Sequence, residues 1–181
     1  MDFSLFWHST QVRAVRASVL VLALSLWLGG CGAYSFSGAT IPSDIETIAI
    51  PIVDDRSTSP FSSLSNDLTD LLVQRFVNQT RLSLSTDNAG ADARLDVVVR
   101  RYTNEPTTVG GDERATANRV TITVDVEYLD QVNDEVFLSR SFSGSSDYSP
   151  VEDGLEGNEA AAQRALTDLA DNIFAQATSN W

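Results

Sequence analysis

The most regular pattern in the sequence is an alternation of apolar and polar residues between Thr116 and Leu129. Successive side chains of a β-strand point to opposite faces of a sheet, so this period of two indicates a strand buried on one face only. The stretch therefore predicts a long strand with one apolar and one polar face. Its apolar positions are Val120, Ile122, Val124, Val126 and Tyr128.

Four shorter segments have the β-branched or apolar composition of strands. Pro51 lacks a backbone donor, so we expect it near a strand end or at a sheet edge. The pair Arg100-Arg101 interrupts an alternating run, which indicates a bulge or a strand leaving the core. The segments are Thr47–Val53, Leu82–Ser85, Arg94–Tyr102 and Val136–Phe142, and the stretches Asp54–Ser57, Thr103–Ala115 and Ser143–Gly157 are expected to be loops.

Two segments carry apolar residues at helical spacing, and each is expected to pack on the core. We predict that the first begins at Ser59, as N-cap, with Pro60 at its first position, and ends near Asn78. We predict that the second runs from near Asn158, as N-cap, to about Thr178. The apolar stripes are Phe61, Leu64, Leu68, Leu71, Leu72 and Phe76, and Ala162, Leu166, Leu169, Ala170, Ile173 and Ala177.

The order of these segments defines the expected fold class. The first helix joins two short strands as a βαβ unit, so those strands should be parallel neighbours. The turn at 131–134 should join the long strand to its hairpin partner. We summarise the order as β-α-β-β-β-α and expect an α+β, two-layer domain with two helices packed on one face of a small mixed β-sheet.

Residues 1–30 have the composition of a secretory leader. Arg13 and Arg16 precede the apolar run Ala17–Leu28. The run is shorter than the roughly 20 residues that span hydrocarbon, as expected of a signal peptide. Leu28-Gly29-Gly30-Cys31 resembles the lipobox of bacterial lipoproteins, which implies cleavage after Gly30 and acyl chains such as palmitate on Cys31. The alternatives are an ordinary signal peptide, or a buried structural Cys. We expect residues 1–30 to be the signal peptide, 31–45 a lipidated tether and 46–181 a single α+β domain.

Composition limits the chemistry available to the mature chain. The only His lies in the leader and the only Cys is Cys31, which argues against zinc sites, Cys–His nucleophiles and Ser-His-Asp triads. We expect no enzyme activity and no cofactor beyond the lipid. The remaining enzyme hypothesis is a carboxylate-based hydrolase using Asp54-Asp55 or Glu152-Asp153, which we interpret instead as solvated turns.

The charge is strongly acidic, with 25 acids against 12 basic residues, all of them Arg. Such a chain is not expected to bind nucleic acid. We interpret the acidity mainly as adaptation to salt, which screens self-repulsion. The alternative is an acidic face that binds cations or a basic partner.

Several segments together make the mature chain similar to the LPS-assembly lipoproteins (LptE-type), in the form found in Bacteroidetes-like bacteria. They are Cys31–Pro42, Leu68–Leu84, Ala117–Val124, Ser141–Ser143 with Asp147-Tyr148, and Ile173–Ala177 with Asn180-Trp181. The resemblance implies two helices on a small mixed sheet, and lipid anchoring on the periplasmic face of the outer membrane. It also implies an LPS-transporting β-barrel partner (LptD-type), inside which the lipoprotein sits as a plug and takes part in LPS delivery.

An acidic chain would need a local Arg cluster to bind LPS phosphates, because Arg can grip phosphate bidentately. The candidates are Arg100, Arg101, Arg114 and Arg119. The competing interpretation is that these residues pair with Glu105, Asp112 or Glu113 on a solvated surface. A second function stays open, because one small α+β fold can serve many tasks: an outer-membrane lipoprotein that activates a periplasmic peptidoglycan synthase.

Overall fold

The alternating stretch forms the long strand β5, Ala115–Asp130, which has a neighbouring strand on each side. All five of its apolar positions are buried, at 2% exposure or less, so one face of β5 covers the core as predicted. The computed structural model describes residues 41–109, 115–154 and 156–179. The predictions for the signal peptide, Gly30, Cys31, most of the tether and Arg114 fall outside these described residues.

The described residues form one mixed, six-stranded sheet in the order β3-β1-β4-β5-β6, with β2 paired to β4. Strands β4, β5 and β6 form an antiparallel meander. The short strands β1, β2 and β3 pair in parallel with β4 or with each other. The bounds are β1 Thr47–Ala49, β2 Asp54–Asp55, β3 Ser83–Leu84, β4 Ala93–Val109 and β6 Glu135–Tyr148.

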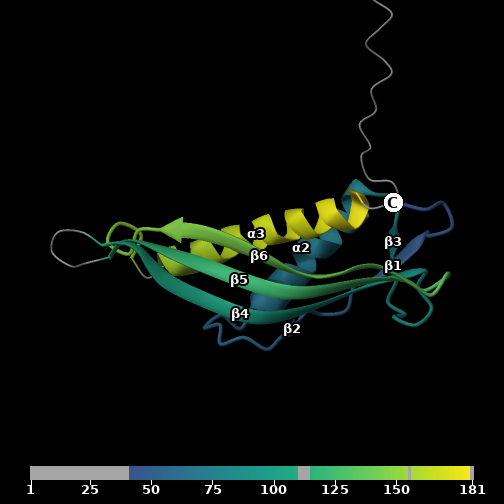
Figure 1. Ribbon diagram of the computed structural model, residues 1–181, viewed down its shortest axis with the longest axis horizontal. Helices are drawn as coiled ribbons and strands as arrows, with labels where there is room; N and C mark the ends of the chain where they lie inside the picture. The colour runs from purple at the N-terminus through teal and green to yellow at the C-terminus, as the bar shows by residue number, and fades with distance from the viewer. Residues whose placement is uncertain (1–40, 110–114, 155, 180–181) are drawn as a thin grey trace, which may run out of the picture. The chain divides into compact units, whose positions relative to one another are not determined.

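Two helices, α2 (Leu64–Gln79) and α3 (Glu156–Ser179), pack on one face of this sheet (Figure 1). Their apolar stripes and the inward residues of β4, β5 and β6 form a single core. Arg75 pairs with Asp171, and the rings of Phe76 and Phe174 meet at 5.3 Å, which joins the two helices. The predicted α+β class, with two helices on one face of a mixed sheet, is confirmed.

Helix α3 and strand β6 lie very close together at Gly144. A Cβ at this position would lie 2.2 Å from the backbone oxygen of Ala165 and 3.0 Å from Cβ of Leu169. Only a residue without a side chain fits here. The backbone of α3 therefore packs directly on the strand, with small residues such as Ala161 and Ala165 fully buried beside it.

Three expectations about strands need correction. The segment expected as one strand over 47–53 ends at Ala49, because Pro51 cannot donate to a ladder. The expected loop at Asp54-Asp55 pairs with β4 as β2, so the order is β-β-α-β-β-β-β-α. Strands β4 and β6 extend into the expected loops 103–115 and 143–157. These extensions are polar, and their pairing with β5 makes them strands although they lack an apolar face.

Both helix starts differ from the prediction. Helix α2 begins at Leu64, not Pro60, because the hydroxyls of Ser57 and Ser59 accept backbone hydrogen bonds two residues on and hold the chain in turns. Asn158 lies inside α3, which begins at Glu156, and its side chain accepts a hydrogen bond from Tyr102 instead of capping the helix.

Two local predictions are confirmed. The register between β4 and β5 shifts between Val99 and Arg101, so Arg100 is the extra residue of a bulge. The segment after α2 forms β3, which lies beside β1 and parallel to it, as the βαβ interpretation requires.

A carboxylate fixes the start of β1 to the start of β4. Asp92 accepts hydrogen bonds from the backbone N–H groups of Glu46 and Thr47, at 3.0 and 2.9 Å, and from the Thr47 hydroxyl at 2.9 Å. These bonds lower the pKa of Asp92, with the one from Glu46 contributing most. Asp92 thus holds together segments more than forty residues apart in sequence.

Candidate functional site

The sheet face opposite the helices carries a group of small hydroxyl side chains, with charged residues in the same and neighbouring rows. The register places Thr103, Thr121 and Ser145 in one row across β4, β5 and β6, and Thr123 and Ser143 in the next. The Thr123 and Ser143 hydroxyls lie 3.1 Å apart. We call this surface the hydroxyl face; it comprises Thr103, Thr121, Thr123, Ser139, Ser141, Ser143 and Ser145.

Ion pairs flank the hydroxyl face along the strands. Nε of Arg100 lies 2.6 Å from a carboxylate oxygen of Asp125, whose other oxygen accepts a 2.5 Å hydrogen bond from Ser141. The bond from Ser141 and then that from Arg100 lower the pKa of Asp125. The charges of Arg100 and Asp125 therefore neutralise each other. Beside this pair lies an open hollow of about 410 Å³, whose lining includes Asp96 and Glu127.

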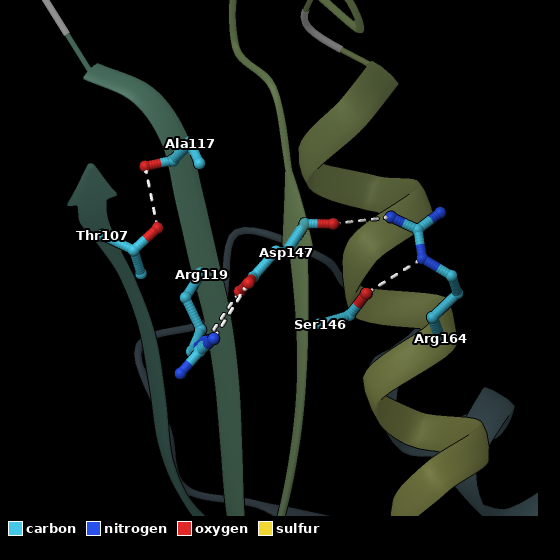
Figure 2. A network of polar contacts seen from close by, with 6 residues as sticks. All are labelled: Thr107, Ala117, Arg119, Ser146, Asp147 and Arg164. Atoms are coloured by element: carbon cyan, nitrogen blue, oxygen red, sulfur yellow. Dashed lines mark hydrogen bonds and ion pairs between the residues drawn. The ribbon is translucent and has the colours of Figure 1, made fainter. Parts of the chain in front are cut away.

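A second network occupies the other end of the strands (Figure 2). Arg119 on β5 donates two hydrogen bonds to Asp147 on β6, at 2.6 and 2.9 Å, which lower the pKa of Asp147. Arg164 of α3 approaches β6 from its other side and donates to the hydroxyl of Ser146 and the backbone oxygen of Asp147, at 2.9 and 3.0 Å. Thr107 joins β4 to β5 through the Ala117 carbonyl.

Polar side chains replace apolar ones on the inner face at this end. Asn104 and Asn118 both donate to the hydroxyl of Tyr148, at 2.8 and 3.3 Å. Tyr102 donates to Asn158 of α3 at 2.7 Å, and burial raises the pKa of Tyr102 to about 12. The pair Tyr102–Asn158 ties the sheet to the first turns of α3.

Among the described residues, the structure does not bring Arg100, Arg101 and Arg119 together in one cluster. Arg101 pairs with Thr123 in the register and Arg119 lies four residues further along β5, which is about 13 Å. Arg100 and Arg119 are ion-paired, with acids other than those expected from the sequence. Arg101 is exposed and has no ion pair within the described part of the chain.

Three carboxylates of the two acidic pairs contact groups within their own segments. Asp54 contacts Arg56, and Asp55 accepts the backbone N–H of Ser57 at 2.8 Å. Asp153 accepts the backbone N–H of Ser149 at 2.7 Å. Within the described ranges, no group of three or more His, Cys, Asp or Glu side chains could hold a metal ion, and no helix there is long and apolar enough to cross a membrane.

The sequence also matches a known family. Residues 45–177 match the model of the lipopolysaccharide-assembly family, LptE. The match spans most of the chain, from before β1 to the last turn of α3. The chain belongs to this family. Family membership places it among lipopolysaccharide-assembly proteins of the cell envelope.

Solved structures share the fold of this family member at low sequence identity. A crystal structure of a protein from Xanthomonas campestris has a TM-score of 0.55 at 15% identity and covers 74% of this chain and 83% of its own. A solution structure of an uncharacterised lipoprotein B from Nitrosomonas europaea has a TM-score of 0.53 at 13% identity, covering 75% and 83%. Among curated proteins, no sequence matches the chain significantly.

The sequence analysis did not predict the contacts of Arg164 and Asp147, or those that join Asn104 and Asn118 to Tyr148. Asp147 and Tyr148 were expected in a loop, which hid their alternation between the two faces of β6. The signal for Asp147 was available in the continued alternation Ser141, Ser143, Ser145, Asp147. The partner of Arg164 is a backbone oxygen, and no residue pattern encodes such a contact.

Proposed function

We propose that this chain is a non-enzymatic outer-membrane lipoprotein that forms a plug and assembly partner of an LPS-transporting β-barrel and takes part in LPS delivery. In this proposal, residues 1–30 are removed and Cys31 carries the lipid anchor on the periplasmic face. The anchor would raise the local concentration of the domain near the barrel, which makes docking a local event.

The hydroxyl face is the observation that supports a barrel partner best. The lumen of an outer-membrane barrel is polar and is lined by alternate residues of its strands. Short Ser and Thr side chains can approach such a wall closely and exchange hydrogen bonds with it. Arg100 and Arg119, at the two ends of the face, are paired within the chain, so docking would bury neither of these two charges without its partner.

Arg101 is the residue that best fits a direct contact with LPS. Its guanidinium is exposed and, within the described residues, not held by a carboxylate, whereas Arg100 and Arg119 would first have to leave their partners. We propose Arg101 as a phosphate contact, and expect Arg101→Ala to weaken LPS binding more than Arg56→Ala. Arg56 is a matched control because it is also exposed, but it is paired with Asp54.

Co-purification from the native host tests the proposal. The tagged full-length chain should retain a stoichiometric β-barrel when the outer membrane is solubilised in mild detergent. Thr121→Trp, which puts a large ring on the hydroxyl face, should release the barrel, while Thr167→Trp on the exposed side of α3 should not. Recovery of a peptidoglycan synthase in place of a barrel, or equal recovery with both variants, would contradict the proposal.

A further inference from the structure

Strand β6 is the last strand of the sheet among the described residues. Ladder bonds of an antiparallel pair alternate along each strand, so every second residue of β6 turns its N–H and C=O away from β5. The contact between Arg164 and the backbone oxygen of Asp147 shows which residues these are. Ser139, Ser141, Ser143 and Ser145 have the same parity as Asp147 and direct their backbone groups outward.

Most of this edge is open in the described structure. Beyond the sheet ladder, none of the backbone–backbone hydrogen bonds among the described residues uses a residue from 139 to 145. Natural sheets usually protect an edge with Pro, Lys, a bulge or a covering element. Between Ser139 and Ser145 β6 has no Pro or Lys, its register with β5 is regular, and its one charged residue, Arg140, donates a hydrogen bond to Gln176 of α3. Arg164 covers only the end at Asp147 (Figure 2).

Helix α3 places one carboxylate, Asp168, beside the open edge, on the same side of the helix as Arg164. Arg164 contacts β6 near Asp147, and Gln176, three turns further along α3, accepts a hydrogen bond from Arg140 at 3.2 Å. Asp168 lies one turn from Arg164 within the same arc of the helix. It is exposed and has no ion pair among the residues that the structure describes. A strand added to β6 would direct alternate side chains towards Asp168.

We propose that the edge Ser139–Ser145 binds an extended segment of a different protein, which adds a strand to the sheet and places a basic side chain near Asp168. Backbone hydrogen bonds would provide the affinity of such strand addition, and alternate side chains would provide its specificity. The net charge of −13 and the absence of Lys disfavour a second copy of this chain as the occupant. The edge uses the backbone groups of serines whose side chains belong to the hydroxyl face, and the test below uses a peptide and does not involve the barrel.

Amide hydrogen exchange of the full chain tests this proposal. In the free protein, the amides of Ser141, Ser143 and Ser145 should exchange much faster than those of Phe142 and Gly144, which bond to β5. The probe is a peptide of about seven residues with alternating Thr and Val and a central Arg. Its addition should slow the three fast amides at least tenfold. Lack of protection at millimolar peptide would overturn the proposal.

Three variants make the test specific. Ser143→Pro removes an outward N–H without breaking a bond to β5 and should abolish peptide binding, whereas Ser143→Thr keeps the N–H and should bind normally. Should Ser143→Pro unfold, Asp168→Asn still tests the charge: it should remove the preference for the Arg peptide over a Glu version. An unchanged preference would refute a basic side chain near Asp168. Sedimentation that shows dimers of the parent chain, and none of Ser143→Pro, would instead identify a second copy of this chain as the occupant and overturn the proposal.

Discussion

Replacement of Gly144 by Ala should destabilise the domain, because the new methyl group has no room. Its carbon would lie 2.2 Å from the Ala165 backbone oxygen and 3.1 Å from the backbone nitrogen of Leu169, where 3.4–4 Å is an ordinary contact. Backbone atoms cannot move aside by side-chain rotation. Helix α3 would therefore have to move outward by about 1 Å over a close-packed core.

The magnitude follows from the cost of overpacking, which is about 1–3 kcal/mol for an added methylene. The lower flexibility of Ala in the unfolded chain returns about 0.4–1 kcal/mol, so we expect a net loss of about 1–2 kcal/mol. For a domain of this size that corresponds to a decrease in Tm of about 3–8 °C.

The assay is chemical denaturation followed by circular dichroism, with the midpoint and slope fitted separately. Ser139→Ala and Ser145→Ala on the same strand are the controls, since both change exposed side chains, and we expect them to lie within about 0.5 kcal/mol of the parent. A Gly144→Ala variant as stable as the parent would refute the direct contact between α3 and β6.

Three further predictions concern buried or partly buried polar groups. Asp92→Asn should lower the free energy of unfolding by about 1–3 kcal/mol in urea denaturation, because the charged acceptor of three hydrogen bonds is lost. Because the pKa of Asp92 is lowered in the folded state, its contribution is complete above the unfolded pKa and is lost as pH falls through the folded value; the variant should therefore show a weaker loss of stability in acid. Tyr102→Phe should cost about 1–2 kcal/mol in thermal denaturation by leaving the Asn158 oxygen without its donor, and an unchanged Tm would argue against that bond. Asp130→Ala should cost about 1–3 kcal/mol, since this buried carboxylate accepts the N–H groups of Val132 and Asn133 in the turn before β6; urea midpoints would measure it, and a neutral result would show that the turn holds itself.

The elements most predictable from the sequence were those with unbroken periodicity. The alternation around Ile122 and the stripe from Ala162 to Ala177 indicate burial directly, because the period of a strand or helix fixes which face each side chain lies on. The helix start at Leu64 was missed because the side chains of Ser57 and Ser59 form turns that compete with capping. The ends of β4 and β6 were missed because their strand character depends on cross-strand partners and not on hydrophobicity.

The candidate site was less predictable than the fold. Arg100 could be assigned to a bulge, since paired charges break an alternation, but its partner Asp125 depends on the register. Likewise, the bidentate contact between Arg119 and Asp147 joins residues 28 positions apart. Strand pairing therefore decides which arginines form ion pairs. Arg100, the extra residue of the bulge, reaches Asp125, whereas the adjacent Arg101 has no ion pair among the described residues.

The sequence positions of the strands that pair with β1 also bear on the order in which the chain can fold. Strand β1 pairs only with β3 and β4 among the described residues, so its partners follow it by more than thirty positions. During synthesis from the N-terminus, β1 and α2 emerge before the strands that cover them, and the apolar stripe of α2 has nothing to pack on. The meander from β4 to β6 is local in sequence and can form first. The N-terminal third would then dock late, which makes it the part most exposed to aggregation or proteolysis before the domain is complete.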